Sequence, residues 1–586
     1  MEISYVLTTL AKEFQSGMEQ HLRSLSEIDL APIPGKHYWH CDREWREEFI
    51  YFVLVDRFHD DLRRKPILAK ERARGSGTPS QLRKFCGGTL KGITKHLDYI
   101  SELGCTALWL SPIFENNDAP DRDSDKYHGY AIQNYLAIDP RFGTKEDLVE
   151  LVAQAHQRDM RVFLDVVANH SGDNWFYLGN EPKAYDQGRE FPFGGWRHTD
   201  RPLPIELRNP NYYGRKGEIR NWDVMPETQD GDFFSLKGYK NDESPDGLAL
   251  QEVIVKAHCY WMREADIDGF RMDAVKHMGE LAIARFCSSI REYAYLLGKR
   301  WFLLFGELVA GDAAASRYIG PNTPTQVGNK TVYYGLNSVL DFLLYWTLPA
   351  VMKGERPPAD LINRYEALRE NALNRGEMGR YLITFLDNHD QIGADCKKRF
   401  AAGLRDEQVI AGVGYLLCAL GTPCIYYGTE QGFSGEGFGD EYIREAMFDL
   451  DDTTRNLLNP QCHIYEEIAK IARVNQKQEA LRFGRMYFRE ISGNGVDFGL
   501  PQGQPCSLVF SRILAEQEVL IAYNTSTTER RIDFAIVDNR IHKKGEAMTF
   551  LYGAEGTVEV LSHSDPGNQS LFVRLELDPM QFVILR

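Results

Sequence analysis

Short strand-like runs that alternate with amphipathic stretches are the feature that most limits what this chain can fold into. There are eight such runs, at 49–55, 107–110, 161–164, 268–273, 301–306, 336–340, 381–385 and 424–427, of which 336–340 is the weakest. Segments with helical spacing lie between them, such as 145–158, 250–264 and 281–296. Largely apolar strands that alternate with helices indicate a parallel sheet covered on both faces.

Eight strand–helix units favour a closed barrel over an open sheet. We therefore predict an α/β fold built on a (β/α)8 TIM barrel. Between His170 and Asp246 the chain has no clear helix and is rich in Gly, Pro, Asn and aromatic residues. A connection of this length in a compact domain is usually functional or a small domain of its own. We interpret it as a subdomain inserted after strand three, whose aromatic residues either stack on a ligand or form its core.

The two ends of the chain have patterns of their own. Short β-type runs separated by turn residues follow Arg485, at 507–510, 519–523, 531–534 and 581–585. They predict a C-terminal antiparallel β-sandwich domain. Apolar residues from Leu7 to Leu25 recur at helical spacing, which predicts a helical N-terminal extension. The expected division is 1–45 for the extension, 46–169 with 247–484 for the barrel, 170–246 for the inserted subdomain B, and 485–586 for the β-sandwich.

Charge and composition exclude several classes of protein. The chain has 84 acidic and 68 basic residues, a net charge of −16, which predicts no general affinity for nucleic acid or anionic membranes. We find no run of about 18 apolar residues and no signal peptide, so we expect a cytoplasmic protein without a membrane partner. The ten cysteines include no CxxC pair, which argues against a zinc ribbon and a disulfide scaffold.

Polar residues are concentrated at four of the strand ends. These segments are Asp165–His170, Arg271–His277, Gly306–Glu307 and Asp387–Asp390. Arg271 and Asp273 stand two apart in a strand, so both side chains point the same way, into the barrel mouth. A guanidinium beside a carboxylate lowers the pKa of the acid and keeps it ionised. Asp273 is therefore suited to attack a carbon centre.

Two further carboxyl groups complete the pattern. Glu307 lies beside an apolar run, where burial would raise the pKa of its carboxyl group and suit it to act as a general acid. Asp390 adds a third carboxylate two strands further on. A nucleophile and an acid about 5 Å apart describe a retaining glycosidase. One such residue alone has a structural alternative, as a helix cap or a salt-bridge partner. Three carboxylates and four histidines (His128, His170, His277 and His389) favour an active site.

These segments make the chain similar to a known family. It resembles the alpha-amylase family of glycoside hydrolases in four short stretches, Asp165–His170, Gly269–His277, Phe305–Val309 and Phe385–Asp390. Gly87–Ile93 and Tyr127–Tyr130 resemble two further segments of the family. The order and approximate spacing agree over about residues 46–480, and the tail resembles the family's C-terminal β-domain.

The resemblance implies a role for each matching carboxylate. Asp273 would be the nucleophile that forms a covalent β-glucosyl intermediate, and Arg271 would orient it. Glu307 would protonate the leaving oxygen and later deprotonate water. Asp390 would hold sugar hydroxyl groups and stabilise the distorted transition state.

The resemblance also implies substrate contacts. His170 and His389 would bind hydroxyl groups of the sugar being cleaved, Tyr130 would stack on its ring, and His128 would line the same site. Lys276 and His277 resemble the family's contacts on the leaving-group side. Asp440 and Arg444 match a four-residue spacing that the family uses near the non-reducing side, with a surface ion pair as the alternative.

A structural calcium is a further implication of the resemblance. Asn169 and the backbone carbonyl of His277 match positions that bind calcium in many members, and oxygen ligands suit this ion. A hydrogen-bonded structural asparagine is the alternative at position 169. We expect no organic cofactor.

The predicted function is that of a retaining α-glycosidase that hydrolyses α-1,4-glucosidic bonds in maltooligosaccharides or starch-like glucans, because Lys276-His277 resembles members acting on this linkage. An α-glucosyl transferase or a trehalose- or sucrose-related enzyme is the alternative, since Asn388–Gly393 resembles trehalose-forming relatives. A non-catalytic carbohydrate-binding protein or transporter partner is a third reading, disfavoured because all three carboxylates are present.

Overall fold

A computed structural model describes most of the chain. The described residues are 22–68, 72–73, 75–117, 124–179, 183–197, 201–320, 325–327, 330–332, 335–371, 377–393, 396–563 and 569–586. Most of the predicted N-terminal helix falls on residues 1–21 and so lies outside them. The described part of the extension has a 3-10 turn at Leu25–Glu27, and Lys36 Nζ donates to the carbonyl oxygens of Arg263 and Glu264 at 2.8 and 2.7 Å.

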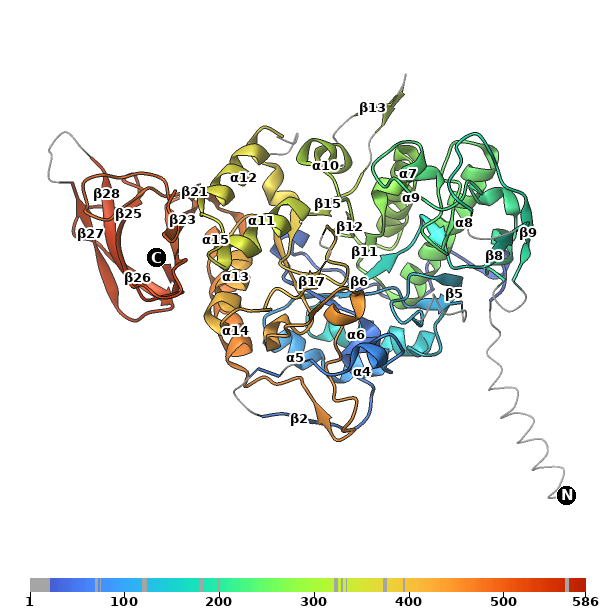
Figure 1. Ribbon diagram of the computed structural model, residues 1–586, viewed down its shortest axis with the longest axis horizontal. Helices are drawn as coiled ribbons and strands as arrows, with labels where there is room; N and C mark the ends of the chain where they lie inside the picture. The colour runs from blue at the N-terminus through green and yellow to red at the C-terminus, as the bar shows by residue number, and fades with distance from the viewer. Residues whose placement is uncertain are drawn as a thin grey trace.

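Eight parallel strands close into a barrel at the centre of the molecule (Figure 1). They are β1 (Ile50–Val53), β3 (Ala107–Leu110), β6 (Arg161–Val166), β11 (Gly269–Met272), β12 (Leu303–Gly306), β15 (Ser338–Leu340), β16 (Leu382–Thr384) and β18 (Thr422–Tyr426). Every residue of these strands is buried, as expected for a parallel sheet with both faces covered. The predicted (β/α)8 barrel is confirmed, including its weakest strand.

Helices surround the barrel (Figure 1). The longer ones are α6 (Lys145–Gln157), α8 (Pro245–Ala265), α9 (Glu280–Leu296), α11 (Phe342–Met352), α12 (Ala359–Arg369), α13 (Asp406–Cys418) and α14 (His463–Lys477). The shorter ones are α2 (Val55–Phe58), α3 (Pro79–Leu82), α4 (Leu90–Lys95), α5 (Leu97–Glu102), α10 (Asp312–Tyr318) and α15 (Glu479–Phe483). Local sequence explains where they begin: Thr144 accepts a hydrogen bond from Asp147 N at 3.3 Å, and Ser244 accepts one from Gly247 N at 3.2 Å.

The connection after β6 contains small paired strands. β7 (His170–Ser171) pairs with β10 (Lys237–Gly238), and β8 (Trp175–Tyr177) pairs with β9 (Phe193–Trp196); the short helix α7 (Glu227–Asp230) lies between β9 and β10. The ring centroids of Trp175 and Tyr213 are 5.6 Å apart, and both side chains are buried. These aromatic residues therefore form a core for the insertion.

Other short strand pairs connect loops around the barrel. β4 (Phe114–Asn116) pairs with β5 (Ile132–Ile138), β2 (Lys65–Pro66) with β20 (Arg455–Asn456), β13 (Thr325–Val327) with β14 (Lys330–Val332), and β17 (Lys397–Lys398) with β19 (Glu436–Gly437). No helix in the described part of the chain is long and apolar enough to cross a membrane.

The C-terminal domain is an antiparallel sheet that folds around its own core. Its nine strands are β21 (Arg485–Phe488), β22 (Ile491–Ser492), β23 (Ser507–Leu514), β24 (Gln517–Asn524), β25 (Arg531–Val537), β26 (Ala547–Tyr552), β27 (Thr557–Ser562), β28 (Leu571–Leu577) and β29 (Phe582–Leu585). Val509 and Leu520 from one half pack with Val573 and Leu575 from the other. The predicted C-terminal antiparallel β-domain is confirmed, and it lies beside α13 and α15 (Figure 1).

Candidate active site

A cavity of about 500 Å³ opens at the C-terminal ends of the barrel strands. Ten of the predicted site residues line it: His128, Tyr130, His170, Asp273, Lys276, His277, Glu307, Asp390, Asp440 and Arg444. Arg271 and His389 are buried behind them, where Arg271 contacts Asp273 and His389 stacks on Tyr130. Asn169 is buried and does not line the cavity. The barrel therefore brings together residues spread over more than 300 positions of the sequence.

Arg271 organises one wall of the cavity, the acidic wall, which consists of Arg271, Asp165, Asp273 and Glu307. Arg271 Nη1 lies 2.8 Å from Asp165 Oδ1 and 2.7 Å from Asp273 Oδ1, and Nη2 lies 3.1 Å from Glu307 Oε2. Asp273 and Glu307 contact adjacent nitrogens of one guanidinium, so their carboxyl groups lie side by side. An acid and a nucleophile that meet on one guanidinium suit the two carboxyl groups of a glycosidase.

One guanidinium faces three carboxyl groups on the acidic wall, so the three cannot all ionise easily. Burial, with the nearby Asp273 and Asp390 charges, raises the pKa of Glu307 to about 8. Burial raises the pKa of Asp273 to about 6, although Arg271 opposes the shift. Arg271 lowers the pKa of Asp273, as we expected, but burial outweighs the guanidinium and the net shift is upward. At pH 7 Asp273 is still mostly ionised and Glu307 mostly protonated.

The backbone also shapes this wall. Ala274, directly after Asp273, has φ 50°, and its N–H donates to Glu307 Oε2 at 3.2 Å. Gln391, directly after Asp390, has φ 50° as well. Non-glycine residues with positive φ are uncommon, and such strain is often found at functional sites. Here it accompanies Asp273 and Asp390, two of the aspartates that line the cavity.

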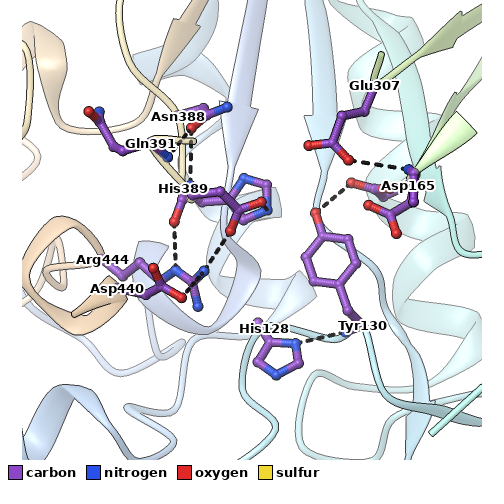
Figure 2. Close-up of polar contacts among 12 residues, drawn as sticks. His128, Tyr130, Asp165, Glu307, Asn388, His389, Gln391, Asp440 and Arg444 are labelled. Carbon is purple, nitrogen blue, oxygen red and sulfur yellow. Dashed lines mark hydrogen bonds and ion pairs between the residues drawn. The ribbon is translucent and has the colours of Figure 1, made fainter. Parts of the chain in front are cut away.

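Asp390 lies on the opposite wall, the cationic wall, which consists of Asp390, Arg444, Asp440 and Lys397. Arg444 Nη2 lies 2.8 Å from Asp390 Oδ1 and 3.2 Å from Asp440 Oδ2. Lys397 Nζ contacts Asp440 and donates to the backbone carbonyl of Asp390. Burial would raise the pKa of Asp390, but His389, Arg444 and Lys397 outweigh it and hold that pKa below its usual range. Figure 2 shows Arg444 and Asp440 across the site from Glu307.

Tyr130 and the histidines form the floor between the two walls. The Tyr130 ring stacks on His389, with centroids 5.3 Å apart, and its hydroxyl donates to Asp165 Oδ2 at 2.9 Å (Figure 2). Burial lowers the pKa of His170 to about 3 and that of His277 to about 4. These rings are therefore neutral at pH 7 and present one donor and one acceptor each, as suits the recognition of hydroxyl groups.

The Lys276–His277 side of the cavity holds aromatic residues that sequence reasoning missed. Trp222, Phe233 and Phe234 line it, and His277 Nδ1 contacts the Thr228 carbonyl at 2.7 Å. Phe234 is 52% exposed, and its φ is 57°. A positive φ is rare for a residue with a bulky side chain. The only signal in the sequence was the aromatic content of the insertion. Lys397 was also missed, because it follows the Asp387–Asp390 segment without a motif.

Comparison with known proteins gives the family. The model of the alpha amylase catalytic domain matches residues 52–473. The chain belongs to the alpha-amylase family. An alpha-amylase of Streptomyces lividans is 29% identical over 582 residues, covering 88% of this chain and 58% of that protein. A cyclomaltodextrin glucanotransferase of Klebsiella oxytoca is 28% identical over 438 residues, covering 70% of this chain and 62% of that protein.

The fold of this alpha-amylase family member has solved counterparts. The crystal structure of an alpha-amylase from Geobacillus thermoleovorans complexed with acarbose has a TM-score of 0.65 and is 24% identical, covering 93% of this chain and 99% of that chain. At this identity the likeness shows the fold. The chain spans about three fifths of the length of the Streptomyces and Klebsiella relatives.

The two calcium ligands expected from the family resemblance, Asn169 and the backbone carbonyl of His277, are both uncharged. Calcium takes six to eight oxygen ligands, usually with several carboxylates among them. Among the described residues no group of three His, Cys, Asp or Glu side chains could hold a metal ion. Asn169 Nδ2 lies 3.4 Å from His170 Nδ1. The backbone carbonyl of Asn169 accepts a hydrogen bond from Tyr239 N at 2.9 Å. Calcium at Asn169 and the His277 carbonyl stays a prediction, and no step below depends on it.

A lysine provides a positive charge inside the insertion. Lys237 is buried, and its Nζ lies 3.4 Å from Asp173 Oδ1 and 5.1 Å from the centroid of the Tyr177 ring. Lys237 belongs to β10, which pairs with the His170–Ser171 strand. The buried ammonium therefore supports the strand pairing that places His170 in the cavity.

Proposed function

We propose that this alpha-amylase family member cleaves α-1,4-glucosidic bonds in maltooligosaccharides or starch-like glucans, with retention of configuration at the anomeric carbon. The arrangement of Asp273 and Glu307 on Arg271 carries this proposal. One carboxyl group is ionised and the other protonated at pH 7, and both line the same cavity. This is the division of roles that a double displacement needs.

In the first step an oxygen of Asp273 attacks the anomeric carbon. Asp273 Oδ1 is held by Arg271, which leaves Oδ2 for the attack. The bond from the anomeric carbon to the leaving oxygen breaks, and that oxygen takes the proton of Glu307. Glu307 Oε2 already accepts from Ala274 N, whereas Oε1 has no hydrogen-bond partner among the described residues and is the oxygen on which the proton is carried.

In the second step water releases the sugar from Asp273. Glu307, now a carboxylate, takes a proton from water, and the water oxygen attacks the anomeric carbon. The bond to Asp273 breaks, which regenerates both side chains. Asp390 accepts hydrogen bonds from sugar hydroxyl groups, for which its low pKa keeps it ionised. The neutral His170 and His389 rings bind hydroxyl groups of the same sugar.

Glucosyl transfer is the second candidate. It differs only in the acceptor, which is the hydroxyl group of another sugar instead of water. The aromatic side chains of Trp222, Phe233 and Phe234 on the Lys276–His277 side favour it, because such surfaces bind sugar rings and compete with water. A trehalose- or sucrose-related reaction would use the same two steps with another substrate.

A time course with maltoheptaose tests the proposal, with every product resolved by chromatography. We expect shorter maltooligosaccharides from the wild-type protein and none from Asp273→Asn. Products longer than the substrate, or non-reducing products, would point to a transferase or to a trehalose-related enzyme. Full activity of Asp273→Asn would contradict the assignment of the nucleophile.

A further inference from the structure

A small antiparallel pair of strands, contributed by two different loops, lies beside the cationic wall. We call it the rim hairpin and define it as β17 and β19 with the residues that lead from β19 to the 3-10 turn at Asp440–Ile443. Its two strands come from the loops after β16 and β18, and Lys397 pairs with Gly437. Two barrel loops are thus joined at the mouth of the cavity.

Ion pairs fasten the rim hairpin to Asp390. Lys397 Nζ contacts the Asp440 carboxylate and the backbone carbonyl of Asp390. Arg444 Nη2 connects the carboxylates of Asp390 and Asp440 from the other side, at 2.8 and 3.2 Å. The cations of Lys397 and Arg444 therefore lie between the carboxylate of Asp440 and the residue Asp390, and they hold the hairpin in place relative to Asp390.

Phe438 is the exposed feature of this hairpin. It stands between Gly437 and Gly439 and is 84% exposed, more than any other large hydrophobic residue found exposed in the described part of the chain. Gly439 is extended, with φ −133° and ψ 163°, so Phe438 and Asp440 project to the same side of the backbone. Asp440 lines the cavity. The Phe438 side chain therefore lies at the rim, on the same side of the hairpin as Asp440, and does not itself line the cavity.

We propose that Phe438 is a stacking platform for a glucose ring that lies beyond the sugar held at Asp390. The proposal rests on the proposed function, and it extends the substrate to a chain of several glucose units. An isolated exposed apolar residue needs no explanation. Phe438 differs because the hairpin that carries it is fastened to Asp390, and because the charged groups of Asp440 and Lys397 belong to the same hairpin. An aromatic face beside polar groups is the usual construction of a sugar-binding site.

Substrates of different length test the platform. In Phe438→Ala we expect the ratio of kcat/KM for maltoheptaose to that for maltotriose to fall about three- to tenfold, through KM for the longer substrate. Phe438→Trp should restore the ratio, because it keeps an aromatic face. Tyr295→Ala is the matched control, since Tyr295 is 62% exposed on α9, outside the rim hairpin. An unchanged ratio in Phe438→Ala, or the same fall in Tyr295→Ala, would overturn the proposal.

Calorimetric titration separates this proposal from the proposed function. If the wild-type protein does not turn maltoheptaose over, the proposed function fails, yet binding of maltoheptaose is still measurable. A Kd that rises about three- to tenfold in Phe438→Ala but not in Tyr295→Ala would support the platform. Equal Kd values for the wild type and Phe438→Ala would overturn it.

Discussion

The acidic wall and the cationic wall are made of the same residue types in different ratios, one cation to three carboxyl groups on the first and two to two on the second. On the acidic wall one guanidinium serves three carboxyl groups, and the pKa of Glu307 rises to about 8. On the cationic wall Arg444 and Lys397 serve two carboxylates, and the pKa of Asp390 falls. The Asp390 side chain is also more exposed, 31% against 9% for Glu307. Charge ratio and exposure therefore act together to make one carboxyl group an acid and keep the other an anion.

The two walls also differ in the scaffold that carries them. Asp165 and Arg271 lie in β6 and β11, and Asp273 and Glu307 directly follow barrel strands. Lys397 and Asp440 lie in loop elements that reach the cavity only through the rim hairpin. Strand ends hold a side chain more firmly than loops do, whereas loops vary between relatives and set specificity. We infer that bond cleavage depends on the acidic wall and substrate choice on the cationic wall.

The largest effect is expected on the acidic wall. Glu307→Gln removes the proton donor, so kcat for maltoheptaose should fall about 10²- to 10⁴-fold. The loss should be much smaller with α-maltosyl fluoride, because fluoride leaves with little help from an acid. Initial rates on both substrates measure this. Asp273→Asn is the matched control, since it should abolish both reactions, and an equal loss on both substrates in Glu307→Gln would contradict its role as the acid.

A smaller effect is expected on the cationic wall. Arg444→Met removes the cation that contacts Asp390, and hydrogen bonds to charged groups are worth enough for a loss in kcat/KM of about 10- to 100-fold. The pKa of Asp390 should rise from its low value, whereas the acid limb, which follows Asp273 at about pH 6, should stay in place. Steady-state kinetics from pH 4 to pH 9 test both statements. This range spans the acid limb at about pH 6 and the alkaline limb at about pH 8. Lys398→Met, which removes a surface charge from the same hairpin, should match the wild type.

The sequence predicted three of the four residues of each wall: Arg271, Asp273 and Glu307 on the acidic wall, and Asp390, Asp440 and Arg444 on the cationic wall. Arg271, Asp273 and Glu307 stand at the ends of buried strands, where local spacing determines which way a side chain points. The eight barrel strands were predictable for the same reason, since a buried parallel strand has a continuous apolar run. The sequence predicted the direction of the Glu307 pKa shift from burial. It did not predict that of Asp273, because the depth at which the fold buries Asp273 beside Arg271 is not visible in the local pattern.

Lys397 and Phe438 could not be predicted from the sequence. Both belong to the rim hairpin, which forms only when the loops after β16 and β18 meet in space. No periodicity marks two-residue strands, and their pairing partners stand about 40 residues apart. The same holds for Phe234, whose exposure depends on a positive φ in the insertion. Contacts between loops are decided by the tertiary fold and leave little trace in local patterns.

The smallest effect tests the charge ratio itself. The wild-type pH profile of kcat/KM should be bell-shaped, falling below about pH 6 as Asp273 gains a proton and above about pH 8 as Glu307 loses one. Asp165→Asn removes one of the three carboxyl groups around Arg271 and can still accept the Tyr130 hydroxyl. With less negative charge nearby Glu307 ionises more easily, so its pKa falls and the alkaline limb moves to lower pH.

The comparison variant for this shift is Asp440→Asn, which removes the same charge from the cationic wall. Asp440 is bound to Arg444 and Lys397 and does not contact Arg271. The Asp440→Asn substitution should leave the alkaline limb in place, whereas KM can change because Asp440 lines the cavity. If Asp440→Asn moved the alkaline limb as far as Asp165→Asn, the pKa of Glu307 would follow the total charge of the cavity. A shift confined to Asp165→Asn means that the carboxyl groups sharing Arg271 set the protonation of the acid.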